Sequence, residues 1–188
     1  LGAILTALVI VLQFMGSFVR FGPFSISLVL IPIVIGAATC GKAVASWLGL
    51  VFGTVVLLSG DAAAFLAVNV PGTIATVLVK GVACGYVASL AYELASKLLS
   101  RVSPEHGKYF AVIAATVACP VVNTGVFLVG CLLFFMETVA GWTQAAGLGN
   151  NVAQYMIFGL VGANFIFELL TNVVLSPIIV RLLNIKGK

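Results

Sequence analysis

Charged residues are scarce in this sequence. Its 188 residues include 9 Lys or Arg and 5 Asp or Glu, so that charged residues make up 7% of the chain, whereas soluble domains contain about 25%. The basic residues form no patch with interleaved aromatic residues, which excludes a nucleic-acid-binding protein. Because 62% of the residues are hydrophobic, the composition also excludes a soluble globular enzyme and a disordered tail.

Residues with catalytic or metal-binding chemistry are few as well. Asp61 is the single aspartate and His106 the single histidine, which leaves no aspartate pair for intramembrane proteolysis and no candidate geometry for a Ser–His or Cys–His pair. The four cysteines show no C-x-x-C spacing, and we expect them to be small apolar helix residues rather than disulfide or zinc ligands. We therefore expect no catalytic site, metal or other cofactor.

One stretch matches a nucleotide-binding pattern. The run from Gly36 to Lys42 fits G-x-x-x-x-G-K, but Ala43 stands where a P-loop has the Ser or Thr that binds magnesium. A P-loop also follows a strand, whereas this run ends an apolar helix. We interpret the match as chance, and we do not expect the chain to hydrolyse ATP alone.

Long apolar runs occupy almost the whole chain. The mean hydropathy is +1.27, and one membrane span needs about 20 apolar residues, so the chain has room for about six spans and for no separate soluble domain. We predict one all-α integral membrane domain over residues 1–188, with Pro32 as a kink in the second helix. The predicted helices are residues 1–19, 25–40, 43–58, 73–99, 108–136 and 152–183, and segments 59–72 and 137–151 are predicted loops.

Basic residues lie in alternate links between these helices. Basic loops stay in the cytoplasm, so both termini are predicted to be cytoplasmic in a multi-pass protein of the plasma membrane. The first apolar run is too long for a signal peptide and lacks its basic flank, and we expect it to be the first span. The links after the second and fourth helices and the C-terminus carry seven of the nine basic residues, which are Lys42, Lys97, Arg101, Lys108, Arg181, Lys186 and Lys188.

Lys80 lies within the apolar part of the fourth helix and shares one face with Thr73, Thr76 and Cys84. A lysine in hydrocarbon costs on the order of 3 kcal/mol unless it faces a partner or a cavity. This face therefore predicts a binding pocket, although the side chain could instead extend to the outer interface about 10 Å away. Glu168 in the sixth helix is expected to lie deeper, so a direct ion pair with Lys80 is not favoured.

The fifth and sixth helices also carry polar residues on their outer halves. Asn164, Glu168 and Asn172 share one face of the sixth helix, and Asn123 follows Pro120 in the fifth. These side chains either converge on a small-molecule pocket with aromatic walls or hydrogen-bond between helices. Asn123 could alternatively bond a carbonyl loosened by Pro120. The candidate substrate-binding residues are Lys80, Asn123, Asn164, Thr76, Asn69, Glu168 and Phe127.

Three residues in the predicted outer loops could reach over such a pocket. They are Asn69, before the fourth helix, and Phe21 and Phe24 in the first loop. Each of them could equally be a plain loop residue.

Small residues spaced four apart occur on two helices. Ala3 and Ala7 lie on the first helix, and Gly81 and Gly85 lie on the fourth. Such pairs let helices approach closely, either within the chain or with a partner.

Several stretches are similar to a known family. They are Ile31-Pro32-Ile33-Val34-Ile35-Gly36-Ala37, Gly49-Leu50-Val51-Phe52-Gly53, Val79-Lys80-Gly81 with Gly85, and Asn164, Glu168, Asn172, Pro177 and Arg181. With six predicted helices and both ends inside, the chain resembles the substrate-binding S components of energy-coupling factor (ECF) vitamin transporters. Ala3 and Ala7 are similar to the family's alanine motif for docking the coupling subunit, although Val11 takes the next position.

The resemblance implies a mechanism and partners. An S component binds a micronutrient at its outer end with high affinity, associates with a transmembrane coupling subunit and two ATPase subunits, and topples to release the ligand inside. The stretch Ile31-Pro32-Ile33-Val34-Ile35-Gly36 looks most like the pantothenate branch, and an anionic vitamin would pair with Lys80. Riboflavin, which would stack on Phe or Trp142, is the second choice. Two other classes stay open, namely a structural subunit of a membrane complex and a proton-coupled carrier that uses Glu168.

Overall fold

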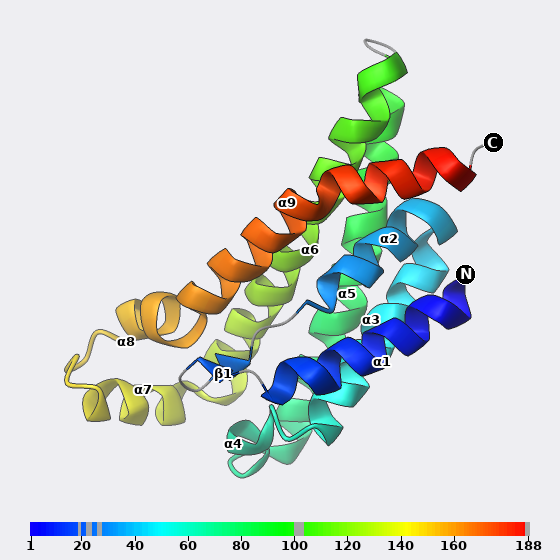
Figure 1. Ribbon diagram of the computed structural model, residues 1–188. Helices are drawn as coiled ribbons and strands as arrows, with labels where there is room; N and C mark the ends of the chain where they lie inside the picture. The colour runs from blue at the N-terminus through cyan, green and yellow to red at the C-terminus, as the bar shows by residue number, and fades with distance from the viewer. Residues whose placement is uncertain (19, 22–23, 26–27, 100–103, 187–188) are drawn as a thin grey trace.

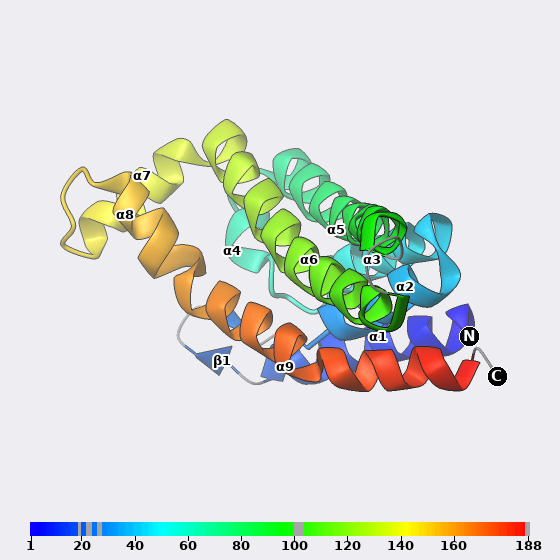
Figure 2. The ribbon, with the colours of Figure 1, turned by 90° about the horizontal axis from the view of Figure 1, so that it is seen from above.

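The chain forms a bundle of helices whose two termini lie at the same end (Figures 1 and 2). The computed structural model describes residues 1–18, 20–21, 24–25, 28–99 and 104–186. Its longer helices are α1 (Gly2–Phe18), α2 (Leu30–Cys40), α3 (Lys42–Leu58), α5 (Val70–Leu99), α6 (Pro104–Phe134) and α9 (Ala163–Lys186). The shorter elements are the antiparallel hairpin β1 (Arg20–Phe21) and β2 (Phe24–Ser25), the helices α4 (Ala63–Leu66), α7 (Met136–Ala145) and α8 (Val152–Gln154), and the π-helical segment η1 (Tyr155–Gly162).

The helical prediction is confirmed, but the described helices differ in their reach across a membrane. Three stretches are long and apolar enough to cross it, namely Val70–Leu99, Gly107–Phe134 and Asn164–Arg181. The others are shorter apolar helices, and α2 has 11 residues. At 1.5 Å per residue α2 extends about 16 Å, roughly half of a hydrocarbon core. The structure therefore does not establish six full-length spans.

Helices α3 and α5 pack backbone against backbone. A Cβ atom on Gly49 of α3 would overlap the carbonyl oxygen of Gly81 of α5, and a Cβ atom on Gly81 would overlap the carbonyl oxygen of Gly49. One turn further on, a Cβ atom on Gly85 would overlap the carbonyl oxygen of Ala45. The Gly81 and Gly85 pair thus serves helix packing within the chain.

The apolar core consists of two clusters. The larger one joins α1, α2, α3, α5, α6 and α9, and its fully buried members include Leu30, Ile33 and Leu48. The smaller one lies where α6, α7 and η1 meet and is built around Phe135 and Val139. The second cluster anchors the end of the bundle that carries the cavity described below.

The start of α2 differs from the prediction. This helix begins at Leu30 rather than at residue 25, after the β1–β2 hairpin. Pro32 is consequently its third residue, a position where the backbone N–H has no partner within the helix. It therefore starts the helix and does not kink it.

Both segments predicted as loops contain helices. Segment 59–72 includes α4 and the first residues of α5, and segment 137–151 includes most of α7. Val139 and Thr143 of α7 are buried one turn apart, which gives this helix an inner face. The chain turns only afterwards, at Gly147 and Gly149, whose φ angles are 75° and 60° and which glycine adopts without strain.

Candidate functional site

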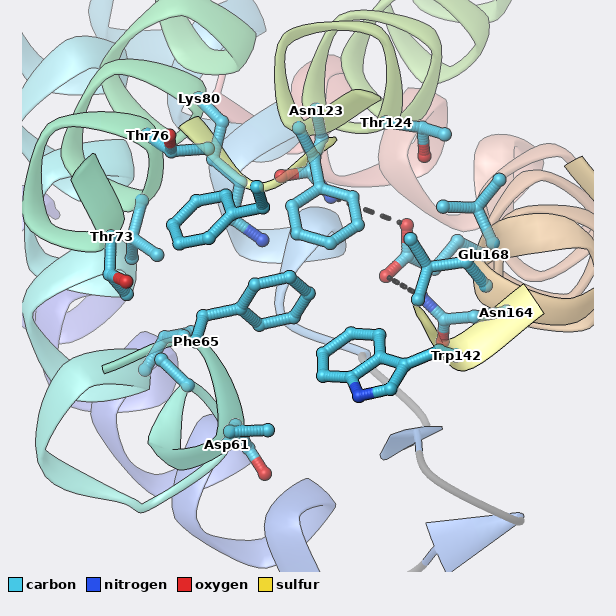
Figure 3. Close-up of a pocket in the computed structure, with 18 of the residues that line it drawn as sticks. Asp61, Phe65, Thr73, Thr76, Lys80, Asn123, Thr124, Trp142, Asn164 and Glu168 are labelled. Carbon is cyan, nitrogen blue, oxygen red and sulfur yellow. Dashed lines mark hydrogen bonds between the residues drawn. The ribbon is translucent and has the colours of Figure 1, made fainter. Parts of the chain in front are cut away.

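A cavity of about 630 Å³ lies among the helix ends remote from the two termini (Figure 1). Its wall is formed by α1, α3, α4, α5, α6, α7, η1 and α9. A cavity of this size is typical of small-molecule sites, which combine apolar walls with a few convergent polar groups. Figure 3 shows polar side chains from α5, α6 and α9 around aromatic rings from α4 and α7.

Lys80 brings a positive charge into this cavity. Its Nζ atom lies 5.4 Å from the ring centroid of Phe52 and 5.4 Å from that of Phe127, so two aromatic faces stabilise the ammonium group. Within the part of the chain that the structure describes, Lys80 forms no ion pair. The lysine therefore has aromatic neighbours and can still accept an anionic partner.

The predicted polar face of α5 divides in two. Thr73 and Thr76 line the cavity together with Lys80. Cys84 is fully buried in the core, where its Sγ atom donates to the carbonyl oxygen of Gly81 at 3.1 Å. Only the part of the face nearer the start of α5 therefore contributes to the site.

Glu168 brings a carboxylate into the same cavity from α9. Its side chain is 1% exposed, and its two oxygens accept from the Nδ2 atoms of Asn164 at 3.1 Å and of Asn123 at 3.5 Å. The bond from Asn123 joins α6 to α9, so this amide does not serve a carbonyl loosened by Pro120. Asn172 lies outside the cavity wall and donates to the backbone oxygen of Glu168 at 2.8 Å.

Two polar atoms of the cavity wall have no partner. The Oγ1 atom of Thr76 and the Oδ1 atom of Asn123 are buried and find no hydrogen-bond partner among the described residues. An unsatisfied buried polar atom costs about 1–3 kcal/mol. Because both atoms belong to residues that line the cavity, a bound molecule with suitable polar groups would remove this cost.

Aromatic side chains close one side of the cavity. Phe65 of α4 makes edge-to-face contacts with Phe127, Phe135 and Trp142, at centroid distances of 5.5, 5.0 and 5.4 Å. Phe65 is not among the residues predicted from the sequence, because the surrounding segment was expected to be a loop. The signal available was an aromatic residue in an otherwise small and apolar stretch.

A hydrogen bond between side chains connects α1 to the segment that precedes α4. Gln13 of α1 is 3% exposed, and its Nε2 atom donates to Oδ2 of Asp61 at 2.7 Å. The hydroxyl of Ser59 donates to the same oxygen at 3.1 Å. Gln13 and Asp61 both line the cavity. This contact therefore ties α1 to the segment that carries Phe65.

The π-helical segment η1 leads into the polar face of α9. Tyr155, Leu160 and Val161 of η1 line the cavity, and Asn164 and Glu168 follow in α9. A π-helical turn shifts the angular position of every residue after it and is frequent at functional sites. The segment thus helps to set the direction in which the α9 side chains point.

Six of the seven predicted binding residues lie on this one cavity, namely Lys80, Asn123, Asn164, Thr76, Glu168 and Phe127. Asn69 is not part of the wall, since its Oδ1 atom accepts from the backbone N–H of Gly72 at 2.9 Å and caps the start of α5. The side chains of Phe21 and Phe24 lie outside the part of the chain that the structure describes. The roles of these residues in binding stay predictions.

A family model for the substrate-specific component of ECF transporters matches residues 1–180. The chain belongs to this family. No curated protein and no solved structure matches it. ECF substrate-specific components are membrane transport subunits rather than enzymes, and they act together with an ECF module of a T component and ATPases. The resemblance predicted from the sequence is thus confirmed at the level of the family.

In this ECF substrate-specific component, the Gln13–Asp61 bond should contribute measurably to stability. Gln13→Leu keeps the size of the side chain but leaves a carboxylate oxygen with one donor fewer, and a hydrogen bond to a charged group contributes about 1.5–3 kcal/mol. We expect a lower thermal unfolding midpoint for the detergent-solubilised variant. Gln144→Leu, the same change at an exposed position of α7, is the matched control. Equal midpoints for both variants would contradict the proposed contact.

Proposed function

We propose that the chain is the high-affinity substrate-binding subunit of an ATP-driven ECF importer for an anionic vitamin or a related micronutrient. The observation that carries this proposal is Lys80, a cavity-lining cation without an ion-pair partner among the described residues. A carboxylate would form a charge-assisted hydrogen bond with it. The import cycle would draw its energy from the partner ATPases.

The chemistry of the cavity favours pantothenate as the first substrate to test. Its carboxylate would pair with Lys80, and its dimethyl-substituted carbon would contact the aromatic wall. Riboflavin is the second choice, since it is neutral and would depend on stacking against Phe65, Phe127 or Trp142. The two vitamins would therefore depend on different residues of the cavity, pantothenate on Lys80 and riboflavin on the aromatic rings.

The membrane arrangement that fits this function has six crossing segments and both termini in the cytoplasm. Basic residues gather in the links on the side of the termini, as expected of cytoplasmic loops. One of them, Lys42, forms an ion pair with Glu93 at 2.8 Å. The cavity lies at the opposite end of the bundle, which would place it at the outer surface of the plasma membrane.

Helix α1 offers a surface for the coupling subunit. Ala3 and Ala7 are exposed on it, whereas Leu5 and Val9 face the core. Small residues on an exposed helix face allow a second helix to approach closely. This arrangement supports α1 as the docking helix for the T component.

A structural role remains a second candidate, because the Asn123–Glu168 bond also joins two helices. Mass spectrometry of small molecules released from the purified, detergent-solubilised protein separates the two functions. We expect an anionic vitamin in near-equimolar amount. A protein that is empty and also binds no member of a panel of vitamins would contradict the binding function and favour the structural one.

A further inference from the structure

We propose that the substrate has two separate polar ends: an anionic group that Lys80 binds, and a set of hydroxyl or N–H donors that Glu168 and Asn123 accept. This inference rests on the proposed function and extends it from one recognised group to two. Lys80 and Glu168 lie on different helices of the same wall (Figure 3). No ion pair between them is found among the described residues, so each is available to a ligand.

The Glu168 side of the cavity favours ligand groups that donate hydrogen bonds. A carboxylate only accepts hydrogen bonds and offers about four lone-pair sites, and here one bond from Asn164 and one from Asn123 use two of them. The Oδ1 atom of Asn123, which is also a pure acceptor, is buried without a partner. A ligand group that donates several hydrogen bonds satisfies both residues, whereas a second carboxylate would be repelled by the carboxylate of Glu168.

The Lys80 side of the cavity favours hydrogen-bond acceptors and anions. An ammonium group only donates hydrogen bonds, and its described neighbours are the faces of Phe52 and Phe127. It therefore selects an anion or a strong acceptor and repels a cationic group. The two ends of the substrate cannot exchange places, so the pair of residues fixes its orientation as well as its class.

Aromatic residues form a third part of the cavity, which is apolar. Phe65, Phe127 and Trp142 contribute apolar surface to the same wall. The substrate is thus an acid that also carries apolar groups and a hydroxyl- or N–H-bearing far end. Simple fatty acids, dicarboxylates and cations fail one of these requirements.

The experiment compares three probes on the full-length protein in detergent by isothermal titration calorimetry. They are pantothenate, its alcohol analogue without the carboxylate, and its analogue without the two hydroxyl groups. Both analogues are expected to bind the wild type more weakly than pantothenate by roughly tenfold or more, as for loss of hydrogen bonds to charged groups. Glu168→Gln is expected to weaken pantothenate by a similar factor and to leave the hydroxyl-free analogue unchanged, because that analogue has nothing for Glu168 to accept.

Glu137→Gln is the matched control, since Glu137 is exposed in the first turn of α7 and is not part of the cavity wall. If Glu168→Gln fails to fold, the inference is tested by the binding of pantothenate and its two analogues to the wild-type protein alone. Equal binding of pantothenate and its hydroxyl-free analogue overturns the two-ended substrate and leaves the proposed function intact. If none of the three probes binds, the test turns to the vitamin that copurifies with the protein or that binds from the panel of vitamins. A vitamin without an anionic group, or without separate hydrogen-bond donors, overturns the inference, and a vitamin with both supports it. A protein that neither carries nor binds any vitamin refutes both proposals.

Discussion

Gly49→Ala should destabilise the protein by about 3 kcal/mol, the upper end of the range of about 1–3 kcal/mol for overpacked cores. The added methyl group would overlap the carbonyl oxygen of Gly81, and a backbone atom cannot rotate away as the end of a side chain can. The two helices must therefore separate along their whole contact. At about 2–4 °C per kcal/mol for a chain of this size, the unfolding midpoint in detergent should fall by about 6–12 °C.

Gly125→Ala provides the control for this prediction. Gly125 lies inside α6, and a Cβ atom there would meet nothing within 4 Å, so the same methyl group should leave the midpoint unchanged or raise it slightly through helix propensity. If Gly49→Ala and Gly125→Ala unfold together, the close contact between α3 and α5 is refuted. Loss of folded protein in the Gly49 variant alone would agree with the prediction.

The same contact links stability to binding. Phe52 is adjacent to Gly53 on α3, and Lys80 is adjacent to Gly81 on α5, so the backbone contact holds the phenyl ring near the ammonium group. A separation of the helices would move these side chains apart. We therefore expect Gly49→Ala to weaken ligand binding even at temperatures where the variant is folded.

The polar part of the site was largely predictable from the sequence. Lys80, Glu168 and Asn123 are conspicuous because polar groups in apolar helices need a physical reason, and the helical period then places each of them on a particular face. That reasoning requires only local spacing. The five candidate binding residues selected in this way all line one cavity in the structure, and they are Thr76, Lys80, Asn123, Asn164 and Glu168.

The remaining wall could not be predicted, because it depends on contacts between distant segments. Gln13 and Asp61 are 48 positions apart, and no periodicity relates them. Phe65 belongs to a helix of four residues, too short to produce a periodic signal. Asn69 lies outside the described cavity wall for the opposite reason, since a local bond from the backbone N–H of Gly72 occupies its side-chain oxygen. Local bonds of this kind compete with longer-range roles for Asn and Asp.

Lys80→Met should lower the affinity for an anionic vitamin by about 100-fold or more. Methionine has a similar length and keeps apolar contact with Phe52 and Phe127, but it removes the one cation that the described cavity wall contains. Loss of one partner from a desolvated ion pair costs about 3–5 kcal/mol, which corresponds to more than about 100-fold in Kd. Folding should not suffer, because a charge has been removed from an apolar bundle rather than added.

Lys108→Met is the matched control for this prediction. Lys108 is exposed near the start of α6 and outside the cavity wall, so the same chemical change there should leave both affinity and unfolding midpoint unaltered. If Lys80→Met binds the copurified vitamin as well as Lys108→Met does, Lys80 does not contact an anion, and the neutral substrate that stacks on the aromatic wall becomes the better choice. If Lys80→Met instead loses its fold, the lysine belongs to the structure of the bundle, as expected for a structural subunit. Selective loss of binding with an unchanged midpoint is the result that only a binding subunit for an anion produces.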